Sequence, residues 1–250
     1  MSSITDSDKI LSRINSHNDF SKYDLNEWII SITVPKPDEF ILDIGCGPGK
    51  QIFKIKELYP SSKIVGVDKT FSSLKLIDDF SKNQSISGVS TVHGDLDSIS
   101  ILLKNYENFN LIFSSFALYY SKNFKKLITD IKSKLKPSGR FFCCGPIKGN
   151  NGELISFQQS IPDSIFEDVK YKMKDEILPC IENTFNSTSI NYFENPITFP
   201  DVMSVMNYWK SSWLYEEKIE NKFLEKLQLF FKTNDNFVTT KKIIGILGTN

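Results

Sequence analysis

The chain has 250 residues, balances 30 Lys+Arg against 30 Asp+Glu, and is 40% hydrophobic and 13% aromatic. This composition is typical of a globular chain with ample core material, and the length predicts a single domain. The sequence holds no run of about 18 apolar residues and opens on a polar segment, so we expect neither a membrane span nor a signal peptide and predict a soluble cytoplasmic protein. The net charge is zero and only two residues are arginine, the side chain best suited to bind phosphate and guanine through two hydrogen bonds. Both facts argue against nucleic-acid binding.

The four cysteines show no CxxC spacing, and the chain has only two histidines. We therefore predict neither a disulfide framework nor a zinc site, and no other metal site. Cys143 and Cys144 follow two phenylalanines in an apolar run, so we expect them to fill space within a strand.

Residues 1–35 predict one or two helices that cover the ligand edge of a sheet. From residue 39 onward, short apolar runs alternate with amphipathic segments, which is typical of parallel strands joined by crossover helices. The predicted strands are 40–42, 64–67, 90–92, 111–113 and 141–144, and the helices between them include 51–58, 72–80 and 124–135. The segment Lys136-Pro137-Ser138-Gly139 is expected to break the last helix and turn the chain into the next strand.

The rhythm changes after residue 146. Residues 147–187 predict helical and irregular structure, followed by a strand at 190–199, helices at 202–213 and 217–231, and a final strand at 242–247. The first five strands build one half of a doubly wound α/β sheet, and the last two are expected to add an antiparallel edge.

A glycine-rich segment, Gly45-Cys46-Gly47-Pro48-Gly49, lies between the first predicted strand and its helix. Three alternating glycines let the backbone turn sharply and approach a ligand. The third glycine comes one residue too early for the GxGxxG loop of dinucleotide-binding folds, and Lys50 is not followed by the Ser or Thr of a P-loop. Both phosphate-binding loops are therefore excluded.

Together with Asp43, this segment resembles the first motif of class I S-adenosylmethionine-dependent methyltransferases, an acidic residue and one spacer before GxGxG. Four further matches come in order: Asp68-Lys69, Gly94-Asp95-Leu96, the run 109–115 and the turn 135–139. Two positions depart from the family pattern, since Asn110 replaces an Asp and Ser138 replaces a Gly. The resemblance covers residues 38–146.

The resemblance implies a Rossmann-like, seven-stranded, mostly parallel sheet with helices on both faces and an antiparallel terminal strand. It implies one domain made of a helical cover (1–35), a cofactor-binding core (38–146), a helical insertion and substrate cap (147–235) and a terminal strand (236–250). It also implies that S-adenosylmethionine is held by Asp43, Gly45, Cys46, Gly47, Gly49, Asp68, Lys69, Asp95, Leu96, Ser114, Ser115 and Tyr23. Simpler roles stay open beside these, because Asp43 could orient the loop and Asp95 could cap a helix.

The residues after the fourth strand narrow the subclass. The run 114–117, Ser-Ser-Phe-Ala, lacks the Asn/Asp-Pro-Pro-aromatic step of amino-methylating nucleic-acid enzymes, the Pro-Cys of pyrimidine carbon-5 enzymes and the acidic cluster of metal-dependent catechol enzymes. The layout resembles the trans-aconitate and malonyl-carrier-protein methyltransferases and related natural-product enzymes. It implies in-line methyl transfer to an oxygen, with nitrogen or carbon as second choices, of a small metabolite or carrier-bound acid. A monomer or homodimer is expected, without nucleic-acid or membrane partners. Two alternatives stay open, a non-catalytic cofactor-binding partner subunit and an RNA methyltransferase.

An aromatic acceptor wall is our hypothesis for the substrate side. Its candidates are Phe116, Tyr119, Tyr120, Phe157, Phe166, Tyr171, Tyr208, Trp209 and Trp213, although aromatic residues at helical spacing also build cores. The catalytic candidates are Tyr119, Tyr120 and His17, the last as a base over the cleft or as part of a solvated helix face.

Residues outside the acceptor wall have their own predicted roles. We expect His93 to be structural or on the surface, and Arg140 to lie at the edge of the sheet opposite the ligand. Residues 10–32 are expected to form a lid, with Tyr23 packed on the methionine end of the cofactor and Trp28 anchored to the sheet.

Overall fold

The computed structural model describes residues 6–165 and 171–250, and contacts divide these residues into two units. The sheet unit comprises residues 25–147, 171–193 and 243–250. The insertion unit comprises the described residues 6–24, 148–165 and 194–242. The expectation of one domain with four parts stays a prediction.

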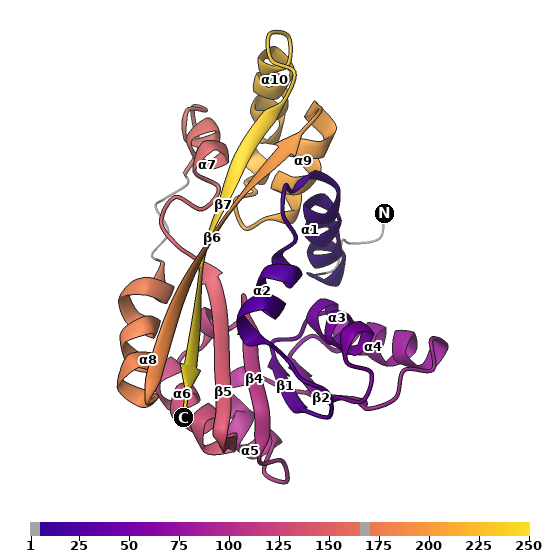
Figure 1. Cartoon of the computed structure of the whole chain (residues 1–250). Coiled ribbons are helices and arrows are strands. Elements are labelled where there is room, and N and C mark those ends of the chain that lie inside the picture. The colour runs from indigo at the N-terminus through magenta and orange to yellow at the C-terminus, as the bar shows by residue number, and fades with distance from the viewer. Residues whose placement is uncertain (1–5, 166–170) are drawn as a thin grey trace. The chain divides into compact units, whose positions relative to one another are not determined.

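Seven strands form one sheet in the order β3-β2-β1-β4-β5-β7-β6. Figure 1 labels all of them except β3. Their bounds are β1 Phe40–Ile44, β2 Lys63–Asp68, β3 Val89–His93, β4 Phe109–Ser115, β5 Leu135–Pro146, β6 Ser187–Phe199 and β7 Phe237–Thr249. The pairs β1–β2, β2–β3, β1–β4 and β4–β5 are parallel, whereas β5–β7 is antiparallel. The predicted Rossmann-like, mostly parallel sheet with an antiparallel terminal strand is therefore confirmed.

Helices fill the connections between the strands. The α-helices are α1 Asp6–Phe20, α2 Leu25–Thr33, α3 Lys50–Leu58, α4 Phe71–Asn83, α5 Ile99–Leu102, α6 Phe124–Lys134, α7 Gly152–Gln159, α8 Leu178–Thr184, α9 Val202–Ser211 and α10 Glu220–Phe230. Short 3-10 turns lie at η1 Leu96–Ser98, η2 Leu118–Tyr120 and η4 Glu217–Ile219, and a π-helical turn, η3 Met173–Ile177, leads into α8.

Alternation along the strands sends side chains to two separate apolar cores of the sheet unit. Cys143 belongs to one core, which includes residues of α6, and Cys144 belongs to the other, which includes residues of α2, α3 and α4. Both cysteines are fully buried and unpaired, so their predicted role as strand fillers is confirmed. Helices thus cover both faces of the sheet. Trp28 of α2 packs edge-on against Phe142, which confirms its predicted anchoring to the sheet.

The insertion unit has a core of its own. Its centre is Trp209, fully buried and stacked on Phe223 with ring centroids 4.0 Å apart. The indole N–H of Trp209 donates to Gln158 Oε1 at 2.8 Å, so the one polar atom of the ring is satisfied inside this core.

One local prediction is wrong. The segment 136–139 does not turn the chain before the fifth strand, because β5 already begins at Leu135 and runs through Pro137 and Gly139. The pairing with β4 jumps from Phe109–Leu135 to Leu111–Arg140, so the Pro-Gly segment is accommodated as a bulge within the strand.

Candidate active site

The glycine-rich segment leaves β1 as a loop of left-handed backbone. Gly45, Gly47 and Gly49 have φ values of 76°, 51° and 84°, which residues with a side chain rarely adopt. The loop is held to the end of β2, where the Gly45 N–H donates to the Val67 carbonyl at 2.7 Å. Gly49 is the N-cap of α3 and completes a strand–loop–helix unit.

The three glycines differ in their surroundings. A Cβ added to Gly45 would overlap the side chain of Ala117, and one added to Gly49 would lie 2.8 Å from Ile77. A Cβ on Gly47 would meet nothing within 4 Å. Gly45 and Gly49 are therefore required for close packing, while Gly47 borders open space in which a ligand has room.

Asp43 lies one spacer before the loop and is 1% exposed. Both of its carboxylate oxygens are buried without a hydrogen-bond partner. Burial, and secondarily the charge of Asp68, raises the pKa of Asp43 well above its ordinary value. A buried carboxylate without a donor is costly, so this position calls for a cationic or hydrogen-bond-donating group.

Asp68 ends β2 and binds the loop from the other side. Its Oδ2 accepts from the Gly47 N–H and its Oδ1 from the Thr70 N–H, both at 2.8 Å. The two backbone bonds fix the carboxylate, and each oxygen keeps acceptor capacity for a further donor. The neighbouring Lys69 is exposed, and its carbonyl contacts His93 Nε2 at 3.0 Å. The predicted surface or structural role of His93 is confirmed.

The predicted adenine acid, Asp95, is exposed at the end of β3. Its Oδ1 accepts from the Asp97 N–H at 2.9 Å and caps η1, so the simpler capping role is confirmed, and a cofactor contact stays a prediction. Leu96, the first residue of η1, is half-buried against the core that contains α6.

The end of β4 carries the next predicted residues. Ser114 is buried, and its hydroxyl donates to the Ile44 carbonyl at 2.9 Å, which joins β4 to the end of β1. Ser115 is half-buried, with its hydroxyl 3.3 Å from the Cys144 sulfur. Phe116 comes next at φ 57°, a strained backbone for an aromatic residue, and its N–H donates to the Cys144 carbonyl at 3.0 Å.

Neither the strain at Phe116 nor the packing of Ala117 against Gly45 is expected from the sequence motifs. A small residue soon after the fourth strand is the one signal in the sequence that points to this close approach.

Tyr119 and Tyr120 lie in η2, at the same carboxyl edge of the sheet. Their rings are tilted against each other with centroids 4.5 Å apart. Tyr119 is half-buried, and its ring lies where a Cβ on Gly145 of β5 would be, so Gly145 makes room for it. Tyr120 is 66% exposed. Of the two, Tyr119 is the one placed at the ends of β4 and β5.

The remaining candidates fall into two groups. His17 and Tyr23 belong to the insertion unit, where His17 is half-buried edge-on against Tyr208 and within 3.1 Å of the Ser21 hydroxyl. Tyr208 and Trp209 are core residues, 1% and 0% exposed, which contradicts an acceptor-wall role for them because their rings are packed among other side chains. Phe157 is half-buried in the same core, Tyr171 is half-buried, and Trp213 is exposed. Phe166 lies outside the described residues.

The edge of the sheet opposite the glycine loop carries a stabilising ion pair. Arg140 forms a bidentate pair with Glu39, both N···O distances being 2.8 Å, and donates to the carbonyls of Thr33 and Val34. The predicted distance of Arg140 from the ligand edge is confirmed.

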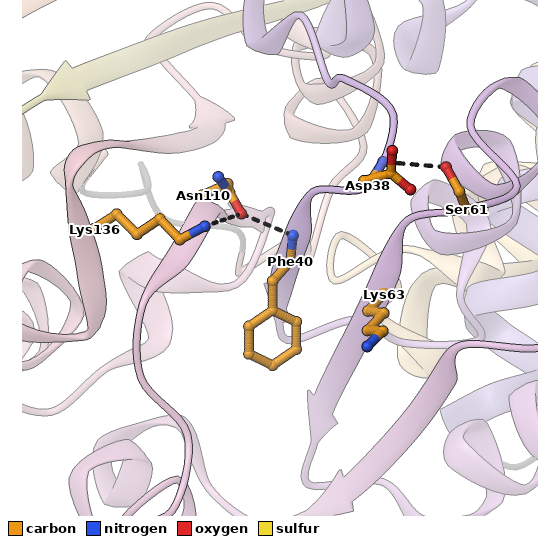
Figure 2. A pocket seen from close by; sticks show the side chains of 6 residues that line it. All are labelled: Asp38, Phe40, Ser61, Lys63, Asn110 and Lys136. Atoms are coloured by element: carbon orange, nitrogen blue, oxygen red, sulfur yellow. Dashed lines mark hydrogen bonds between the residues drawn. The ribbon is translucent and has the colours of Figure 1, made fainter.

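A hollow of about 500 Å³ opens at this same edge, where β1, β2 and β4 begin (Figure 2). Asn110, the departure from the family pattern, lies here, and its Oδ1 accepts from the Phe40 N–H at 2.9 Å and from Lys136 Nζ at 3.1 Å.

Within the described residues, no group of three or more His, Cys, Asp and Glu side chains is arranged to hold a metal ion. The absence of a metal stays a prediction. Among the same residues, no helix combines the length and apolar character needed to cross a membrane.

Three curated proteins similar to this chain are two methyltransferases and a carboxymethyltransferase, with different substrates. (S)-coclaurine N-methyltransferase of Thalictrum flavum subsp. glaucum is 22% identical over 77% of this chain and 48% of its own length. tRNA U34 carboxymethyltransferase of Campylobacter fetus subsp. fetus is 26% identical over 74% of this chain and 61% of its own length. Trans-aconitate 2-methyltransferase of Deinococcus radiodurans is 23% identical over 42% of this chain and 36% of its own length. The chain thus spans about half to three fifths of the first two relatives.

Solved structures share the fold. The YcgJ protein of Bacillus subtilis superposes with a TM-score of 0.62 at 16% identity, over 90% of this chain and 97% of that one. Geranyl diphosphate C-methyltransferase of Streptomyces coelicolor A3(2), crystallised with S-adenosylhomocysteine, superposes with a TM-score of 0.55 at 14% identity, over 99% of this chain and 86% of that one. The family model of a methyltransferase domain matches residues 35–187, more than half of the chain, and the chain therefore belongs to this methyltransferase family.

Proposed function

We propose that the protein is an S-adenosylmethionine-dependent methyltransferase that uses the carboxyl edge of the sheet unit as its active site. The observation that carries the proposal is Asp43, a buried carboxylate with no donor, beside a glycine loop that leaves open space at Gly47. The methionine part of the cofactor bears an ammonium group, the kind of donor that this carboxylate lacks. The residues present therefore fit the cofactor.

The roles of the other residues follow from their chemistry. Asp68 is fixed by two backbone N–H groups and offers its remaining lone pairs to the ribose hydroxyls. Asp95 is exposed at the end of β3 and is assigned to the adenine amino group. S-adenosylmethionine, when bound, supplies a methyl group already activated on a sulfonium. The protein's own work is then to orient the acceptor for in-line attack and to keep water out.

The acceptor in this proposal is an oxygen of a small metabolite or of a carrier-bound acid. In the sheet unit as described, the one histidine is His93, and its ring nitrogen contacts the Lys69 carbonyl. A carboxylate acceptor is nucleophilic without a base at neutral pH, which suits such a site. Tyr119 is then the residue that orients the acceptor. We further propose a cytoplasmic enzyme of natural-product type.

Binding and turnover test this function. Titration with S-adenosylhomocysteine should give saturable binding, and labelled cofactor incubated with cell extract should place the label in a low-molecular-mass or acyl-carrier fraction. Lack of binding at millimolar ligand overturns the assignment. Binding without any labelled product supports instead a non-catalytic cofactor-binding subunit.

A second candidate is methyl transfer to RNA, favoured by the 26% identity to a tRNA carboxymethyltransferase. The same labelling experiment separates it from the first, because label that co-purifies with RNA and is released by ribonuclease identifies an RNA acceptor. The two arginines and zero net charge speak for the small-molecule acceptor.

A further inference from the structure

The outer edge of β6 has no partner strand along its first half in the part of the chain that the structure describes. β6 is the terminal strand of the sheet order, and its first half, residues 187–193, belongs to the sheet unit. The second half receives a short cover within the insertion unit, where the Lys22 N–H donates to the Pro196 carbonyl and Ser21 bridges Ile197. Within the sheet unit as described, no strand lies beyond residues 187–193.

This half-strand lacks the devices that usually protect an edge. Residues 187–193 read Ser-Thr-Ser-Ile-Asn-Tyr-Phe, with no charge, proline or glycine, and the first charge comes at Glu194. The opposite edge, β3, is protected by being only five residues long, whereas β6 has thirteen. A long, uncharged edge of β-forming residues is a template for pairing with another chain.

Side-chain burial points the same way. In β6, none of residues 187–192 is buried, whereas residues 193–199 alternate between buried and less buried positions. Ile190 and Tyr192 share one face and are 40% and 55% exposed, while Phe193 on the other face packs against Trp28. The uncharged window therefore has no partner strand on one side among the described residues and presents two large apolar side chains to solvent.

We propose that residues 187–193 of β6 pair antiparallel with the same residues of a second copy, so that two sheets join into one across a two-fold axis at Ile190. This register places Ile190 opposite Ile190 of the second copy, Tyr192 opposite Thr188, and Phe193 opposite Ser187. No charges are opposed, and an aromatic residue meets a β-branched residue, a favourable cross-strand pair. A second copy fits because the window is complementary to itself, and such a contact is closed and two-fold.

The expected dimer is reversible. Seven residues from each chain make a small interface, so we expect a Kd in the range of about 1–100 µM. Sedimentation velocity over a concentration series should show the sedimentation coefficient rising from the monomer to the dimer value. A protein that stays monomeric up to about 500 µM, or that forms open-ended assemblies, overturns the proposal.

Charge substitutions locate the contact. Ile190→Lys should weaken the dimer at least about tenfold, because a lysine on the edge opposes its own copy across the axis. The matched control is Val238→Lys, which alters a β-branched residue of β7 that is 43% exposed, and it should leave the dimer intact. A dimer that Ile190→Lys does not weaken overturns the proposal.

A cysteine at the axis tests the register independently of stability. Cα atoms opposed on neighbouring antiparallel strands are about 4.5–5.5 Å apart, within reach of a disulfide. Ile190→Cys should therefore form a covalent dimer under mild oxidation, faster than Val238→Cys. Equal rates for the two variants would contradict the register.

Discussion

Asp68 and Gly47 are joined by a hydrogen bond of 2.8 Å from the Gly47 N–H to the Asp68 carboxylate. The bond ties the end of β2 to the one glycine of the loop that borders open space. One carboxylate therefore shapes the loop and lies at the carboxyl edge of the sheet, so its removal should lower the affinity for the cofactor.

Asp68→Ala should weaken S-adenosylhomocysteine binding by at least about tenfold, because the Gly47 and Thr70 N–H groups lose their acceptor and the ribose loses its partner. Isothermal titration calorimetry measures the change. Asp78→Ala is the control, since Asp78 accepts from the Thr91 hydroxyl on the surface of the same unit. Equal affinity in Asp68→Ala and the wild type would remove Asp68 from the site.

Asp43 predicts an unusual dependence of stability on pH. Burial raises the pKa of Asp43 in the folded protein well above the ordinary value of 3.8, so folding favours the protonated form. The ligand-free protein therefore loses stability from this group as the pH rises from about 4 through the folded pKa. Asn has the shape of the protonated acid and no charge. Asp43→Asn should unfold at a higher temperature than the wild type at pH 8, with the gap closing toward pH 4.

The same variant should bind S-adenosylhomocysteine less tightly, because Asn cannot ionise to pair with the ammonium group of the ligand. The predicted gap in stability between variant and wild type is measured as a difference in Tm. Each kcal/mol corresponds to about 2–4 °C for a chain of this size, which calorimetry resolves. A pH-independent gap in Tm, or a variant that is less stable at pH 8, would mean that Asp43 is charged and satisfied in the free protein.

The glycines should separate stability from binding. Gly45→Ala should destabilise the protein by several kcal/mol, about 3 or more, because its Cβ overlaps Ala117 in addition to the strain of a positive φ. Gly47→Ala meets open space and should cost only about 1 kcal/mol, yet it should weaken ligand binding. Urea unfolding and calorimetry measure the two effects. Unchanged binding in Gly47→Ala would show that the ligand lies elsewhere.

Arg140 should matter for stability alone. Its pair with Glu39 is largely buried, with side chains 16% and 8% exposed. Arg140→Ala takes the charged donor from Glu39, which keeps only the Lys36 N–H, and removes the Arg140 bonds to the carbonyls of Thr33, Val34 and Asn110. We expect a loss of about 3–5 kcal/mol. S-adenosylhomocysteine affinity, measured below the unfolding temperature, should stay within about twofold of the wild type. A selective loss of affinity would place Arg140 in the site.

The parallel core was predictable because strands buried on both faces read as apolar runs and because the loop motif sits at a fixed place among them. The bulge in β5 was not, since Pro137 and Gly139 break regular structure equally in a loop or in a strand. What makes it a bulge is tertiary: Lys136 reaches Asn110, and the Asn250 side chain donates to the Lys136 carbonyl at 3.2 Å.

The candidate site was predictable in its residues and less so in their state. The motif identifies Asp43, but its lack of a donor depends on packing around the end of β1. Tyr208 and Trp209 have the same aromatic character as Tyr119, and the sequence spacing does not distinguish a ring in a core from a ring at an edge. Packing within the insertion unit places the rings of Tyr208 and Trp209 in a core, whereas the room left by Gly145 places the ring of Tyr119 at the edge of the sheet.

The lid, residues 10–32, stays a prediction, and two hydrogen bonds in the structure offer a way to test it. The Tyr23 backbone is clamped by Asn195, whose Oδ1 accepts from the Tyr23 N–H at 3.0 Å and whose Nδ2 donates to the Tyr23 carbonyl at 2.8 Å. Asn195 is 2% exposed, so its amide has no easy substitute for these bonds. Tyr23 itself is 50% exposed and sits between α1 and α2. The segment is thus held by Asn195 through the backbone of Tyr23, while the Tyr23 side chain is available to a ligand.

If this segment closes on the cofactor, its amides should exchange hydrogen more slowly with S-adenosylhomocysteine bound than without it. Asn195→Ala should raise exchange around Tyr23 in the free protein and increase the Kd for the ligand, because ordering the segment then costs more on binding. Asn191→Ala, on the uncharged half of the same strand, is the matched control and should change neither. Equal exchange of residues 10–32 in the free and bound protein would show a permanently packed cover, and water exclusion would then have to come from elsewhere in the chain.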